Sequence, residues 1–166
     1  MTIDLLKRLG WFMLFLLAQV LVLGRIHLFH CATPLLYVYF IAQFQRNYPK
    51  WALLLWSFAM GLSVDIFFNT PGVAAASLTL IGAIQPYLME LFIPRDSFEE
   101  LQPTLKTLGG TKYSYYICTL VLLYCIVFYT LEMFSFFNGL QWFLNVMGSA
   151  AVTLLLVFTF EMVKTK

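Results

Sequence analysis

Charged side chains are scarce in this sequence: only 11% of its 166 residues are charged, whereas 61% are hydrophobic. A typical soluble domain is about 25% charged and about 45–50% apolar. The mean hydropathy of +0.84 also excludes a soluble domain, and we expect an all-α integral membrane protein. Since one helical crossing takes roughly 20 apolar residues, the chain can cross a bilayer about six times, which leaves no room for a soluble catalytic domain of ~100 residues.

Metal-binding and catalytic patterns are missing as well. The cysteines Cys31, Cys118 and Cys125 form no CxxC pair, and the last two lie in an apolar run, where cysteine usually acts as a small buried hydrophobe. His27 and His30 lie beside Cys31, but a metal site usually takes three or four ligands, so we interpret them as polar residues of an external turn. There is no HExxH, P-loop or GxSxG motif and no carboxylate pair within one span. We therefore expect no enzyme, no cofactor and no metal.

Apolar runs separated by polar connectors predict a six-transmembrane-helix bundle that forms a single domain. The predicted spans are about 9–28, 33–46, 50–68, 73–93, 113–132 and 140–162, and residues 94–112 form the one long polar loop. The run 33–46 is short for a full crossing. It therefore extends through Gln43 and Gln45, tilts, or partly re-enters the membrane.

The basic residues are scattered rather than clustered, which argues against binding to nucleic acid. Their order along the chain predicts the topology. With six spans and a cytoplasmic N-terminus, nine of the ten lysines and arginines fall inside, and only Arg25 falls outside. The positive-inside rule then favours an N-in, C-in arrangement with the 94–112 loop in the cytoplasm.

The stretch from Gly61 to Gly72 places a carboxylate, Asp65, near the end of an apolar run that Asn69-Thr-Pro-Gly72 then breaks. Ionisable residues within a membrane are costly unless paired, so they are functional-site candidates. A rise of 1.5 Å per residue puts Asp65 roughly 20 Å across the bilayer. We expect Asp65 to pair with Arg25, or to accept hydrogen bonds from Asn69 and Thr70.

Two interpretations of Asp65 stay open. It can simply fix the helix register and the bend, or it can line a polar pocket or partner contact together with Arg25, His27, Asn69 and Thr70. Small residues recur every four positions after the turn, at Ala75, Thr79 and Ala83, and share one helix face. That spacing predicts close helix packing, with a lipid-facing Ala-rich turn as the alternative.

Three segments together carry a resemblance to a known family. They are His27-Leu-Phe-x-x-Ala-Thr-Pro-Leu-Leu-Tyr-Val-Tyr-Phe40, Gly61-Leu-x-x-Asp-Ile-Phe-x-Asn-Thr-Pro-Gly72 and Phe92-Ile-Pro-Arg95. The combination resembles MreD, the rod shape-determining membrane protein family, in its Bacteroidetes-type form. The second segment is the most specific part, because hydrophobic spans alone match many families.

The resemblance implies a non-enzymatic, multi-pass scaffold of the bacterial inner membrane. Such a scaffold binds MreC directly and acts, through the complex, with MreB and with RodA and its transpeptidase in cell-wall elongation. It also implies a bundle similar to the substrate-binding subunit of energy-coupling-factor transporters, with a cavity open to the outer side. The alternative function is therefore a vitamin-binding subunit, for which Tyr37 and Tyr39 would join the polar residues around Asp65. The missing catalytic set makes an intramembrane enzyme the weaker rival.

Overall fold

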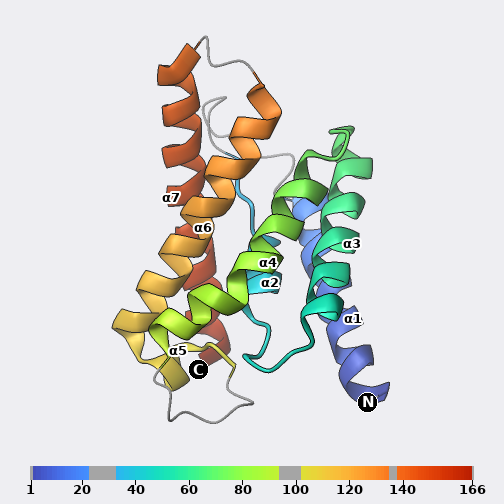
Figure 1. Ribbon diagram of the computed structural model, residues 1–166, viewed down its shortest axis with the longest axis vertical. Helices are drawn as coiled ribbons and strands as arrows, with labels where there is room; N and C mark the ends of the chain where they lie inside the picture. Colours follow the sequence, from blue (N-terminus) through green and yellow to red (C-terminus); the bar gives the residue numbers. More distant parts are fainter. Residues whose placement is uncertain (1, 23–32, 94–101, 135–137, 166) are drawn as a thin grey trace.

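The computed structural model describes residues 2–22, 33–93, 102–134 and 138–165, and those residues form helices without any strand (Figure 1). The α-helices are α1 (Thr2–Leu17), α2 (Val38–Ala42), α3 (Lys50–Phe68), α4 (Val73–Phe92), α5 (Leu105–Leu108), α6 (Gly110–Met133) and α7 (Gly139–Thr165), and a π-helical turn, η1 (Ala18–Val22), continues α1.

Four of the described helices are long and apolar enough to cross a membrane: α3, α4, α6 and most of α7. The described part of the chain is therefore all-helical and contains four candidate membrane-spanning helices, which indicates a membrane protein. The predicted spans 50–68 and 73–93 coincide with α3 and α4 to within one residue. Helices α6 and α7 each begin up to three residues before the predicted spans and end up to three residues after them. Helix α1 begins at Thr2, seven residues before the predicted start of the first span at residue 9, and residues 23–28 of that span lie outside the described chain.

The prediction of a helical span over 33–46 is wrong, because only the five residues of α2 are helical there. Residues on both sides of α2 form turns and irregular backbone whose polar groups bond to side chains of other helices. The prediction of one continuous loop over 94–112 also fails. Helix α5 begins after Thr104, whose hydroxyl and backbone N–H form a capping box with Thr107, and α6 begins at Gly110.

Helices α3 and α4 form an antiparallel hairpin whose axes approach closely. The turn between them uses two left-handed residues, Asn69 (φ 56°) and Gly72 (φ 79°), which end α3 and start α4. A Cβ atom on Gly61 would lie only 2.5–2.7 Å from backbone atoms of Ala74 and Ala75, so only glycine fits there. On α4, a Cβ on Gly82 would collide with the side chain of Ser57.

The close-packed face of α4 differs from the predicted stripe. Ala75 is buried against α3 as expected, but Thr79 is half-buried and Ala83 is exposed. The positions of α4 with a close approach to α3 are Ala75, which meets Gly61, and Gly82, which meets Ser57. A strict four-residue period drifts off one face of a helix with 3.6 residues per turn, which explains why Ala83 leaves the contact.

Both chain ends, helix α5 and the connector between α2 and α3 lie at the lower end of Figure 1, whereas the α3–α4 turn lies at the upper end. The described basic residues near those lower elements include Lys7, Arg46, Lys106 and Lys164. This gathering at one end is what a shared cytoplasmic location requires, and the side of the membrane stays a prediction.

We predict that Gly61→Ala destabilises the protein by about 1–3 kcal/mol, because the added methyl group must push α3 and α4 apart. Thermal unfolding of the purified protein in detergent measures the loss. The matched control is Gly10→Ala on α1, where nothing lies within 4 Å of the added carbon. Equal stability of the two variants would contradict the close packing of this hairpin.

Candidate functional site

The carboxylate of Asp65 is buried at the start of α4, where it accepts three hydrogen bonds. Its Oδ1 accepts from the Thr70 hydroxyl at 2.7 Å and from the Ala74 N–H at 2.9 Å, and its Oδ2 accepts from the Ala75 N–H at 2.8 Å. The first N–H groups of a helix have no partner within that helix. Gly72, at the N-cap position, has no side chain to supply one. Asp65 therefore caps α4 from the preceding helix, and its negative charge suits the positive end of the helix dipole.

This geometry answers part of the prediction for Asp65. The expected hydrogen bond from Thr70 is confirmed. Asn69 contributes its backbone instead, because its N–H bonds to the main-chain carbonyl of Asp65. Arg25 and His27 lie outside the described residues. With three donors satisfied and only 5% of the residue exposed, the Asp65 carboxylate favours the interpretation that it fixes the bend.

A second polar feature is the buried segment 33–44, which crosses the interior of the bundle between the long helices. Residues 34–42 and Phe44 are buried, and Thr33 and Gln43 are half-buried. Non-helical backbone at membrane depth is tolerated only where protein or water satisfies its polar groups. Here side chains from four other elements supply those partners.

At the start of the segment, hydroxyl groups of α6 and α7 hold the backbone. The N–H of Thr33 donates to Ser149 Oγ at 3.1 Å, and the Thr33 hydroxyl lies 2.7 Å from the Tyr129 hydroxyl. Tyr129 and Ser149 are themselves 2.5 Å apart. Two residues further along the segment, the N–H of Leu35 donates to Thr153 Oγ1 at 3.1 Å.

Carbonyl groups of the segment accept hydrogen bonds from two glutamines and a tyrosine. The Gln19 amide donates to the Pro34 carbonyl at 2.8 Å, across from η1. The Tyr116 hydroxyl donates to the Ala42 carbonyl at 3.2 Å. The Gln85 amide of α4 donates to the Phe44 carbonyl at 3.3 Å and to the Tyr116 hydroxyl at 3.1 Å. These bonds connect α1, α4 and α6 through one central strip of backbone.

Two tyrosines of the segment bond to buried side chains. Tyr37 bonds to Tyr124 of α6, and Tyr39 donates to Glu161 of α7, which also accepts from the Leu105 N–H at 3.4 Å. Sequence analysis missed this network. The available signal was the isolated polar residues within apolar runs, namely Gln19, Gln85, Ser149, Thr153 and Glu161.

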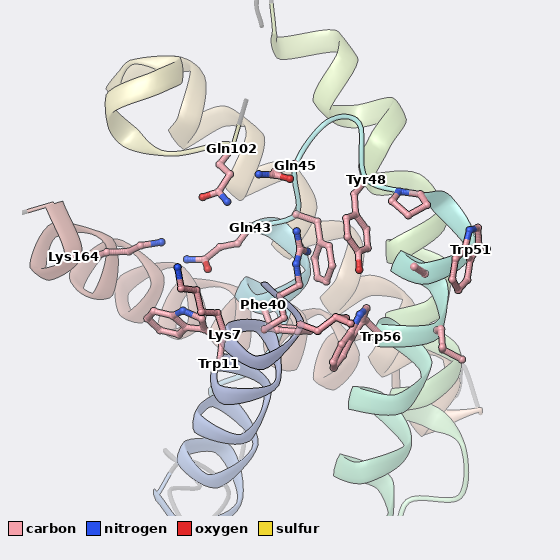
Figure 2. A pocket seen from close by; sticks show the side chains of 16 residues that line it. Lys7, Trp11, Phe40, Gln43, Gln45, Tyr48, Trp51, Trp56, Gln102 and Lys164 are labelled. Atoms are coloured by element: carbon pink, nitrogen blue, oxygen red, sulfur yellow. The ribbon is translucent and has the colours of Figure 1, made fainter. Parts of the chain in front are cut away.

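A groove of about 950 Å³ opens at the end of the molecule that holds both termini, beside the last residues of the buried segment (Figure 2). Its walls carry three cations, Lys7, Arg8 and Lys164, together with aromatic rings and glutamines. None of the described residues that line it is acidic. Sequence reasoning did not single out this groove.

Metal binding finds no support in the part of the chain that the structure describes, where no group of three His, Cys, Asp or Glu side chains gathers. Cys125 is buried and Cys118 is half-buried, and both are free thiols. His27, His30 and Cys31 lie outside the described residues.

We predict that Asp65→Ala destabilises the protein by about 2–4 kcal/mol, because two buried N–H groups lose their acceptor and each costs about 1–3 kcal/mol. Thr70→Val removes one donor and leaves the carboxylate bonded to α4, so it should cost only about 1 kcal/mol. Thermal unfolding in detergent compares the two. An Asp65→Ala protein as stable as the parent would refute the capping role.

We further predict that Thr153→Val costs about 1–3 kcal/mol, since it leaves the buried Leu35 N–H without an acceptor. Thr159→Val is the control on the same helix, because the exposed Thr159 hydroxyl bonds only to the Leu155 carbonyl of its own helix at 2.7 Å. The control should change stability by less than about 0.5 kcal/mol. Similar losses for both would show that segment 33–44 does not depend on α7 for its hydrogen bonds.

Comparison with known proteins gives no match. No protein-family model matches the chain, and neither a curated protein nor a solved structure matches it. The resemblance of the Gly61–Gly72 stretch and the contacts described above are therefore the observations from which a function has to be argued.

Proposed function

We propose that this protein is a non-enzymatic inner-membrane scaffold of the cell-wall elongation complex, which binds MreC and helps to control rod shape. The sequence resemblance supports the family, and the all-helical architecture with membrane-spanning helices supports an integral membrane protein. MreB and RodA with its transpeptidase would then be reached through MreC rather than by direct contact.

The proposal includes six passages through the bilayer with both termini in the cytoplasm. Four are the long apolar helices, and α1 with η1 supplies a fifth. The sixth is the buried segment 33–44, whose start bonds to Tyr129, in the last turns of α6, and to Ser149 of α7. Its end bonds to Gln85, in the second half of α4, and Figure 1 shows that α6 and α4 end at opposite ends of the molecule. The arrangement of an energy-coupling-factor substrate subunit stays part of this proposal.

The observation that carries the binding role is the exposed apolar side of α7. Only 28% of the most apolar stretch of α7 is buried, against 39–44% for α3, α4 and α6. The exposed large side chains of α7 are Leu140, Phe143, Leu144, Met147, Leu155, Met162 and Val163. A helix that is this open on one side suits lateral packing by the transmembrane helix of MreC.

The contact expected from sequence, a polar notch at Asp65 flanked by small residues, is a weaker docking place. The Asp65 carboxylate is bonded to Thr70 and α4, and Ala75 packs against Gly61 within the hairpin. Both features therefore act inside this protein. The mechanism we propose is lateral packing of the MreC helix against α7.

The vitamin-carrier alternative gains no specific support. Tyr37 and Tyr39 bond to Tyr124 and Glu161 in the interior, and Asp65 is occupied by α4. These groups are engaged with the protein itself instead of lining a shared cavity. The groove of about 950 Å³ lies at the end that the topology assigns to the cytoplasm, whereas a carrier of this kind needs an outward cavity.

We predict that a photo-crosslinking residue at Leu144 or Leu155 of α7 captures MreC in cells, because both side chains are exposed on the least buried of the four candidate membrane-spanning helices. The matched controls are Leu55 and Leu62 of α3, which are also exposed and apolar. They should give no MreC adduct. Adducts from α3 but not from α7 would leave the scaffold function standing and refute this docking face.

Depletion of the protein tests the function itself. Loss of the scaffold should round the cells and disperse wall synthesis, and the parent chain supplied in trans should restore rod shape. Cells that keep their normal shape and wall synthesis after depletion would refute the proposed function, whatever the crosslinking shows.

A further inference from the structure

The groove at the terminal end combines positive charge with a lack of neutralising partners. Lys7 and Lys164 extend toward it from α1 and α7, and Figure 2 shows both side chains beside Gln43. Arg8 joins them from the next position on α1. No carboxylate among the described residues forms an ion pair with any of the three. The groove therefore holds up to three positive charges that no described acidic residue compensates.

Aromatic rings, rather than carboxylates, hold two of these cations. The Arg8 guanidinium lies over the rings of Tyr48 and Phe44, at 4.1 and 4.9 Å from their centroids. The Lys164 ammonium lies over Trp11 at 5.6 Å. A cation–π contact positions a cation but takes up no N–H donor in a conventional hydrogen bond. The donors of Arg8 and Lys164 thus stay available to an anion.

Gln43 adds a neutral donor to the same place. Its buried side-chain nitrogen lies beside the Tyr39 hydroxyl, but no described acceptor meets it in hydrogen-bond geometry, and the Tyr39 hydroxyl donates to Glu161. Buried donors without a partner are rare in folded proteins and call for an explanation. An acceptor oxygen between Gln43, Lys7 and Lys164 would supply the missing bond.

The other wall of the groove is apolar and continues onto the outer surface of α3. Trp51 is 73% exposed and Leu55 is 61% exposed, and both line the groove. Tryptophan at the end of a transmembrane helix lies typically at the level of the lipid headgroups, and basic residues gather at the same level. The groove thus offers donors for an anionic head beside a surface for a hydrocarbon tail.

We propose that this groove binds the phosphate headgroup of an anionic phospholipid among Lys7, Arg8, Gln43 and Lys164, with an acyl chain over Trp51 and Leu55. The juxtaposition of unneutralised cations, an unpartnered donor and an exposed apolar wall favours a lipid over a soluble phosphate. The site is independent of the proposed scaffold role and holds whether or not MreC is a partner.

Native mass spectrometry of the full-length protein in neutral detergent tests this, with equimolar phosphatidylglycerol and phosphatidylcholine as the probes. The parent should retain phosphatidylglycerol preferentially. Each basic residue near a membrane surface contributes about fivefold to anionic-lipid binding, so the double variant Lys7→Gln/Lys164→Gln should lose about 25-fold of that retention. Thermal unfolding without lipid checks that the variant stays folded.

The matched control is Lys50→Gln, which removes the same charge at the start of α3, where Lys50 lies over Tyr87 and not in the groove. It should retain phosphatidylglycerol like the parent. Equal retention of the two lipids by the parent, or an equal loss in Lys50→Gln, would overturn the proposal. Displacement of phosphatidylglycerol by inorganic phosphate at matched ionic strength would assign the groove to a soluble anion and overturn it too.

Discussion

The structure depends on one constraint: backbone polar groups inside a membrane must find partners within the protein. The long helices meet it internally, but the segment 33–44 does not, because only five of its residues are helical. Side chains from three elements far apart in the sequence meet it instead, namely Gln19 of η1, Gln85 of α4, and Ser149 and Thr153 of α7. Each bond that satisfies the segment also fixes a long helix beside it, so the segment organises the bundle around itself.

The same constraint explains why the Asp65 carboxylate is buried against the start of α4. The first N–H groups of α4 need acceptors, and its N-cap residue, Gly72, has no side chain to supply one. The carboxylate of Asp65, which precedes the turn, accepts hydrogen bonds from two of these N–H groups. The left-handed residues Asn69 and Gly72 bring the two helices into that position, and Gly61 lets their backbones meet. A buried charge that is costly when alone becomes stable here because each of its oxygens has a donor. Capping and close packing therefore act on the same few residues.

Hydrophobic pattern alone was enough to predict α3 and α4, because an apolar run of the right length ends at an Asn-Thr-Pro-Gly turn. The hydrophobic pattern could not predict that most of residues 33–46 are non-helical, since a buried irregular segment and a buried helix are equally apolar. The deciding residues, Ser149 and Thr153, lie more than 100 positions away, within an apolar run that does not mark them as partners of this segment. Ala83 illustrates the same limit on a smaller scale, because its exposure depends on how α4 rotates against α3. The groove was missed because Lys7, Arg8 and Lys164 meet only when the two ends of the chain come together.

The buried segment also links the interior to the groove. Phe44 belongs to both, because its carbonyl accepts from Gln85 of α4 while its ring carries the Arg8 guanidinium. Gln43, one residue earlier, turns its unpartnered nitrogen to the groove, whereas Tyr39, four residues earlier, bonds to Glu161 of α7. The position of the cations thus depends on the hydrogen bonds that hold the segment in place. The polar side chains that hold the segment are engaged within the protein, whereas α7 exposes an apolar side and the groove carries positive charge, which is why we place the two proposed contacts there.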